Sequence, residues 1–68
     1  MKNKGLIILR VNHGLTQVEM AKVCYVSKST YNFIENGKRR GSAEFWQRVK
    51  EYFKLDGEQM WKLQNPTM

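Results

Sequence analysis

A chain of 68 residues has room for one domain, because chains this short rarely divide into two. Its single cysteine cannot form an internal disulfide, which favours a reducing cytoplasm. The longest apolar run covers only positions 6–9, so we expect neither a membrane span nor a secretory leader. Twelve Lys and Arg against six Asp and Glu give a net charge of +6 and a pI near 9.8, which is typical of nucleic-acid-binding domains.

Helices are predicted along the whole chain, because the glycines separate apolar-periodic segments and the one proline lies near the C-terminus. The predicted starts, most of them marked by a capping side chain, are Lys4 or Gly5, Thr16, Ser27, Ser42 and Asp56. Three of the helices are expected to end at Asn12, Asn36 and Phe53. The sequence therefore predicts an all-α bundle of five short helices, with one domain over residues 1–64 and a frayed tail over 65–68.

Apolar residues at helical spacing supply the expected core. They are Leu6, Leu9, Met20, Ala21, Cys24, Tyr31, Ile34, Trp46, Val49, Phe53, Met60 and Leu63. Six further apolar residues exceed what so small a core needs, namely Ile7, Ile8, Val11, Phe45, Tyr52 and Trp61. These six either complete the bundle or form an exposed patch for a second subunit, and we favour a dimer contact from the last helix and its flanks.

Residues 15–42 predict two helices joined by a short turn, with one face of the second helix left free. Ala21 lets the two helices approach closely, Val26 fills the turn, and Ile34 ties the second helix to the core. The free face carries Lys28, Ser29, Asn32, Phe33 and Asn36. None of these residues is acidic, and Lys, Ser and Asn side chains hydrogen-bond base edges in a major groove about 12 Å wide.

The basic sequence Lys38-Arg39-Arg40 follows this helix directly, on a loop that would run along a DNA backbone. Basic residues that serve only solubility need not cluster beside the one helix that fits a groove. Its placement therefore favours double-stranded DNA as the partner.

The chain resembles the Cro/cI-type helix-turn-helix domain of phage repressors and small bacterial regulators from about Leu6 to Trp61. The residues that carry the resemblance are Leu15-Thr16-Gln17, Ala21, Val26-Ser27-Lys28-Ser29-Thr30 and Ile34-Glu35-Asn36-Gly37-Lys38-Arg39. The resemblance implies base contacts from Lys28, Ser29, Asn32 and Phe33. It implies DNA-backbone contacts from Gln17, Ser27, Asn36, Lys38, Arg39 and Arg40, and a structural ion pair between Arg10 and Glu35. It also implies a homodimer on a two-fold symmetric operator.

Four residues depart from the family pattern. Tyr25 stands where the family usually has glycine, and a left-handed conformation would cost tyrosine about 1 kcal/mol there. Cys24 replaces a larger aliphatic side chain, and Gly41 takes a common proline position and is expected to loosen the loop. Phe33 stands where a polar base-reading residue is common, so it either contacts a thymine methyl group or packs against the protein.

The sequence thus predicts a DNA-binding transcriptional regulator that acts by occupying an operator, with repression as its expected role. An alternative is a protein-interaction module on the same fold, either an antitoxin or an antirepressor, which would use the surplus apolar surface. No enzyme activity, metal or cofactor is expected, because one His and one Cys provide no nucleophile-and-base pair or ligand cluster.

Overall fold

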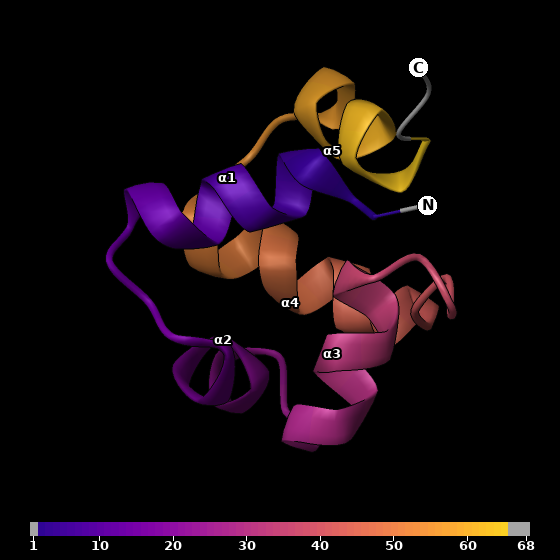
Figure 1. The fold of residues 1–68 in the computed structure, drawn as a ribbon. Helices are drawn as coiled ribbons and strands as arrows, with labels where there is room; N and C mark the ends of the chain where they lie inside the picture. Colours follow the sequence, from indigo (N-terminus) through magenta and orange to yellow (C-terminus); the bar gives the residue numbers. More distant parts are fainter. Residues whose placement is uncertain (1, 66–68) are drawn as a thin grey trace.

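The computed structural model describes residues 2–65, which form five helices around one core (Figure 1). The helices are α1 (Lys4–Asn12), α2 (Gln17–Val23), α3 (Lys28–Glu35), α4 (Ala43–Phe53) and α5 (Gly57–Gln64). α2 packs chiefly on α3, α1 packs on α3 and α5, and α4 packs on α2 and α5. The predicted all-α class is confirmed. No helix within residues 2–65 has the length and apolar character needed to span a bilayer.

Each helix begins at a side chain that accepts a hydrogen bond from a free backbone N–H group of the first turn. The capping residues are Asn3, Thr16, Ser27, Ser42 and Asp56. Thr16 and Asp56 form reciprocal capping boxes with the residues three positions later, as the sequence predicts. Short helices such as these depend on capping and packing, because isolated helices of this length are marginal in water.

Asn3 is a cap that was not predicted from the sequence, and it also joins three helices. Its side-chain oxygen accepts from the Leu6 N–H at 3.0 Å, and its Nδ2 donates to the Leu63 carbonyl at 2.8 Å. Its own backbone N–H donates to the Glu35 carbonyl at 2.8 Å. The start of α1 is therefore fixed to the ends of α3 and α5.

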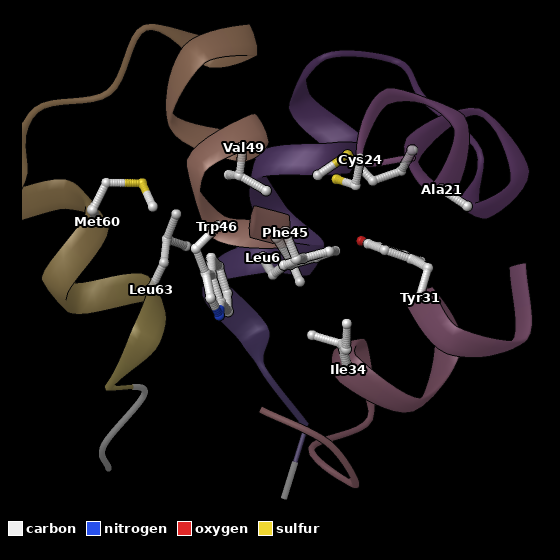
Figure 2. Packing of buried hydrophobic residues seen from close by; sticks show 11 residues of the cluster. Leu6, Ala21, Cys24, Tyr31, Ile34, Phe45, Trp46, Val49, Met60 and Leu63 are labelled. Carbon is white, nitrogen blue, oxygen red and sulfur yellow. The ribbon is translucent and has the colours of Figure 1, made fainter. Parts of the chain in front are cut away.

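Side chains from all five helices meet in the core (Figure 2). Met60 and Leu63 from α5 lie on one side of the centre, while Cys24 and Tyr31 lie on the other. Of the six apolar residues beyond the expected core, Phe45 completes the bundle, because this side chain is 1% exposed. The remaining predicted core residues are buried, except for Leu9 and Phe53, which are half-buried and pack against the core; Ile8, Val11, Tyr52 and Trp61 are exposed and Ile7 is half-buried.

Tyr25 and Gly41 are two of the five described residues that adopt a positive φ. Tyr25 has φ 59°, and the Arg48 guanidinium lies over its ring, with 3.6 Å between Cζ and the ring centroid. Gly41 has φ 84°, and a Cβ there would lie 3.0 Å from Trp46 Nε1 and 3.1 Å from Phe45 Cδ2. The missing side chain at Gly41 lets the loop pack closely on α4, and the effect of this glycine on the loop's mobility stays a prediction.

Of the predicted frayed tail, residues 66–68 lie outside the described residues. Asn65 is exposed, and its side-chain Nδ2 donates to the Trp61 carbonyl at 2.9 Å, so this residue is tied to the end of α5.

Candidate nucleic-acid interface

Four side chains of α3 line a shallow hollow of about 300 Å³ on the surface. They are Lys28, Ser29, Asn32 and Phe33, the four residues for which base contacts are predicted. Asn32 is half-buried and the other three are exposed. Because α3 turns its Tyr31 and Ile34 side chains into the core, these residues are left on the outward side of the helix.

The turn between α2 and α3 holds this helix in place. Ala21 is 2% exposed, and its small side chain permits the close packing of the two helices. The Val26 N–H donates to the Ala21 carbonyl at 3.0 Å, and the Val26 side chain packs against the core from within the turn. The predicted roles of these two residues agree with their positions.

The buried carboxylate of Glu35 gathers donors from three elements. Its Oε2 accepts from Arg10 Nε at 2.9 Å and from the Tyr31 hydroxyl at 2.6 Å. Its Oε1 accepts from Gln17 Nε2 at 2.8 Å. Arg10 also donates through Nη1 to the Leu15 carbonyl at 2.8 Å. The ion pair of Arg10 and Glu35 thus belongs to a larger network that joins α1, α2 and α3.

Tyr31 was predicted only as a core residue, and its contact with Glu35 was not foreseen. The four-residue spacing on one helix is the signal that would have indicated it. Burial raises the pKa of the Tyr31 hydroxyl, and its hydrogen bond to Glu35 raises it further, so the hydroxyl remains a donor at neutral pH. Burial also opposes ionisation of Glu35, but the hydrogen bonds from Tyr31, Gln17 and Arg10 outweigh it, and the pKa of Glu35 is lowered.

We therefore expect acid to destabilise the protein partly through Glu35. Since its pKa is lowered on folding, the stabilisation is fully present above the ordinary value of 4.5 and is lost as the pH falls through the folded-state pKa. Urea unfolding on both sides of pH 4.5 measures this loss. The free energy of unfolding of Glu35→Gln should depend less steeply on pH than that of the parent. Glu51→Gln, which removes an exposed carboxylate, should keep the slope of the parent. Equal slopes for the parent and Glu35→Gln would contradict this assignment.

A chain of side-chain amides connects the carboxylate to the hollow. Asn32 Nδ2 donates to Gln17 Oε1 at 3.4 Å, and Asn36 Nδ2 donates to Asn32 Oδ1 at 3.0 Å. Gln17 in turn donates to Glu35. Asn32 keeps a second N–H and a second lone pair for a DNA base, while its orientation is set by its two neighbours.

The basic loop after α3 is anchored to the end of that helix. The backbone N–H groups of Lys38 and Arg39 donate to the Phe33 carbonyl, at 2.8 and 3.2 Å. The Arg39 guanidinium lies over the Phe33 ring, with Cζ 5.3 Å from the centroid. Arg40 accepts through its carbonyl from Trp46 Nε1 at 2.8 Å, and all three basic side chains are exposed.

The residues with predicted DNA contacts therefore lie in three places: around the hollow on α3, on the basic loop after α3, and at the start of α3. Lys28, Ser29, Asn32 and Phe33 share the hollow, while Gln17 and Asn36 join it through Asn32. Arg39 lies over Phe33, while Lys38 and Arg40 do not line the hollow. Ser27 lies at the start of α3, where its hydroxyl accepts from the Thr30 N–H and donates to Thr30 Oγ1.

Cys24 lies in the core and is 2% exposed. Burial raises the pKa of its thiol to about 11, so it is protonated at neutral pH and behaves as a small apolar side chain. Within residues 2–65, no three His, Cys, Asp or Glu side chains gather in a metal-binding cluster.

A surface helix that carries hydrogen-bond donors, packs on a second helix across a short turn and is followed by a basic loop defines a helix-turn-helix DNA-binding domain. A family model described as Helix-turn-helix matches residues 6–59, which is most of the chain. The chain belongs to this family, of the Cro/cI type. Neither the curated proteins nor the solved structures gave a match.

Proposed function

We propose that the protein is a sequence-specific transcriptional regulator that acts as a repressor. It inserts α3 into the major groove of an operator and excludes RNA polymerase by occupying that site. The observation that carries this proposal is the hollow on α3, where Lys28, Ser29 and Asn32 present hydrogen-bonding groups and no acidic side chain is present. DNA of a bacterium or its phage lies in the cytoplasm, where a protein with one buried thiol is stable.

The residues divide between base and backbone contacts. Base edges would be contacted by Lys28, Ser29, Asn32 and Phe33. Phosphates would be contacted by Gln17, Ser27, Asn36, Lys38, Arg39 and Arg40. Gln17 accepts from Asn32 and donates one Nε2 N–H to Glu35, so its second Nε2 N–H is available to a phosphate oxygen. Asn36 donates one Nδ2 N–H to Asn32 and keeps the other for a phosphate.

A homodimer on a symmetric operator agrees with the size of the domain. The chain measures 26 × 25 × 23 Å, and half-sites one helical turn apart separate two recognition helices by about 34 Å. The longest extent of one copy is smaller than this separation, so two copies have room to occupy adjacent half-sites.

Selection from randomised duplex DNA at about physiological salt tests the proposal. A recovered palindrome with half-sites about one turn apart is the expected result. Retention of DNA with no shared sequence would show backbone affinity alone and would overturn the proposed function.

Replacing Arg39 and Arg40 together with alanine is expected to weaken binding to all DNA sequences alike, because both side chains are exposed on the loop beside α3. The slope of log K against log salt should fall by about 0.9 for each phosphate that the variant no longer neutralises. Titrations at several salt concentrations measure this slope. The matched variant Lys50→Ala/Lys62→Ala removes the same charge from α4 and α5, and an equal change of slope in both variants would contradict a specific role for the loop.

A second candidate function is a protein-interaction module, such as an antitoxin or an antirepressor. It rests on the exposure of Ile8, Val11 and Trp61, which are 58%, 57% and 63% exposed on α1 and α5. Exposed apolar side chains of this kind are common at protein interfaces. Such a module has no need for an α3 face free of acidic residues, which is why DNA binding is the first proposal.

A further inference from the structure

Phe33 is an apolar side chain on a face that is otherwise polar. The sequence leaves two interpretations for it, contact with a thymine methyl group or packing against the protein. The ring is 38% exposed and lines the hollow together with Lys28, Ser29 and Asn32. It is therefore not a member of the core shown in Figure 2, which takes Tyr31 and Ile34 from the same helix.

The position of the ring is supported by the basic loop. The Arg39 guanidinium lies over the ring at 5.3 Å, a distance at which a cation is attracted to an aromatic face. Two backbone N–H groups of the same loop donate to the Phe33 carbonyl. The ring thus has protein on the Arg39 side, while part of it remains open to the hollow between the base-reading residues.

The chemistry of the major groove decides what such a ring can contact. Among the groups that base pairs present there, the thymine C5 methyl is the apolar one, while the remaining groups are hydrogen-bond donors and acceptors. An aromatic ring placed against a donor or acceptor would leave that group without a partner at the interface, which is unfavourable.

We propose that Phe33 recognises the C5 methyl group of one thymine in each half-site of the operator. This inference rests on the proposed function, because it requires α3 to lie in the major groove. Lys28, Ser29 and Asn32 line the same hollow as the ring and supply hydrogen bonds to neighbouring base edges, so the thymine lies within the sequence that these residues read.

The test replaces each thymine of the selected site with deoxyuridine, one at a time in one half-site. Deoxyuridine keeps every hydrogen-bonding group of thymine and lacks only the methyl group. Binding is expected to weaken about fourfold at one position, the ratio that burial of one methyl-sized group provides. The other thymines outside the reach of Phe33 should tolerate the replacement.

Protein variants assign the effect to Phe33. Phe33→Ala should bind the thymine and deoxyuridine sites equally at that position. Tyr52→Ala, which removes another exposed aromatic ring from α4, should keep the preference for thymine. Phe33→Gln serves the same purpose if the alanine variant fails to fold, because it lacks the ring and keeps a longer side chain than alanine beside Arg39.

The outcomes separate this inference from the proposed function. A selected palindrome with no thymine, or with no thymine preference that depends on Phe33, would overturn the role of Phe33 and leave the regulator standing. If the ring instead binds a protein partner, the selected site will show no thymine preference that depends on Phe33. Failure to select any shared sequence would overturn both proposals.

Discussion

Replacing Glu35 with alanine is expected to lower the free energy of unfolding by about 3–5 kcal/mol, the usual cost of removing one partner from a buried ion pair. The substitution leaves Arg10 Nε and the Tyr31 hydroxyl without their acceptor. It also releases Gln17 Nε2. Because a core of this size rarely provides more than about 3–5 kcal/mol, the alanine variant should be largely unfolded at room temperature.

Circular dichroism with urea or heat measures this effect, and two variants calibrate it. Tyr31→Phe removes one hydrogen bond to the same carboxylate and should cost about 1.5–3 kcal/mol. Glu51→Ala removes an exposed carboxylate and should change stability by less than about 0.5 kcal/mol. A cooperative melt of Glu35→Ala close to that of the parent would contradict a stabilising role for the network.

The network shows which part of the site the sequence predicts. The ion pair of Arg10 and Glu35 is implied by the family resemblance, and the structure contains it at 2.9 Å. The contributions of Gln17 and Tyr31 depend on side-chain rotamers and on how closely α2 approaches α3. Neither quantity can be obtained from residue spacing along the chain.

The helices themselves follow from local signals. The caps at Thr16, Ser27 and Asp56 lie where the first turn needs an acceptor, and their hydroxyl and carboxylate oxygens satisfy N–H groups three residues away. Asn3 was missed because half of its role is tertiary: its Nδ2 donates to the carbonyl of Leu63, 60 positions further along the chain.

Phe45 shows why a buried side chain can be taken for a surplus one. The spacing of Trp46 and Val49 predicts a single buried stripe on α4, and Phe45 lies about 100° away from Trp46 around the helix. In the fold, α4 packs on both α2 and α5, so it buries a wider arc than one stripe (Figure 1). The Phe45 ring lies 6.3 Å from the Tyr31 ring, which joins it to α3.

Replacing Lys28 or Asn32 with alanine is expected to relax the preference for one base position of the operator by about 1–3 kcal/mol. The two variants should differ in their effect on overall affinity. Lys28 is exposed in the hollow, so its removal should affect the position it contacts. Asn32 also orients Gln17 and Asn36, so its removal should weaken binding to every sequence as well.

Binding of each variant to all single-base changes of the selected operator, at one salt concentration, measures both effects. The control Lys50→Ala removes one positive charge from the side where α4 meets α5 and should leave the base preferences unchanged. An unchanged preference at every position in Lys28→Ala would exclude base reading by that residue. For Asn32→Ala, a uniform loss of affinity without relaxed preference would assign the amide to positioning of the phosphate contacts, because its hydrogen bonds to Gln17 and Asn36 would then be its whole contribution.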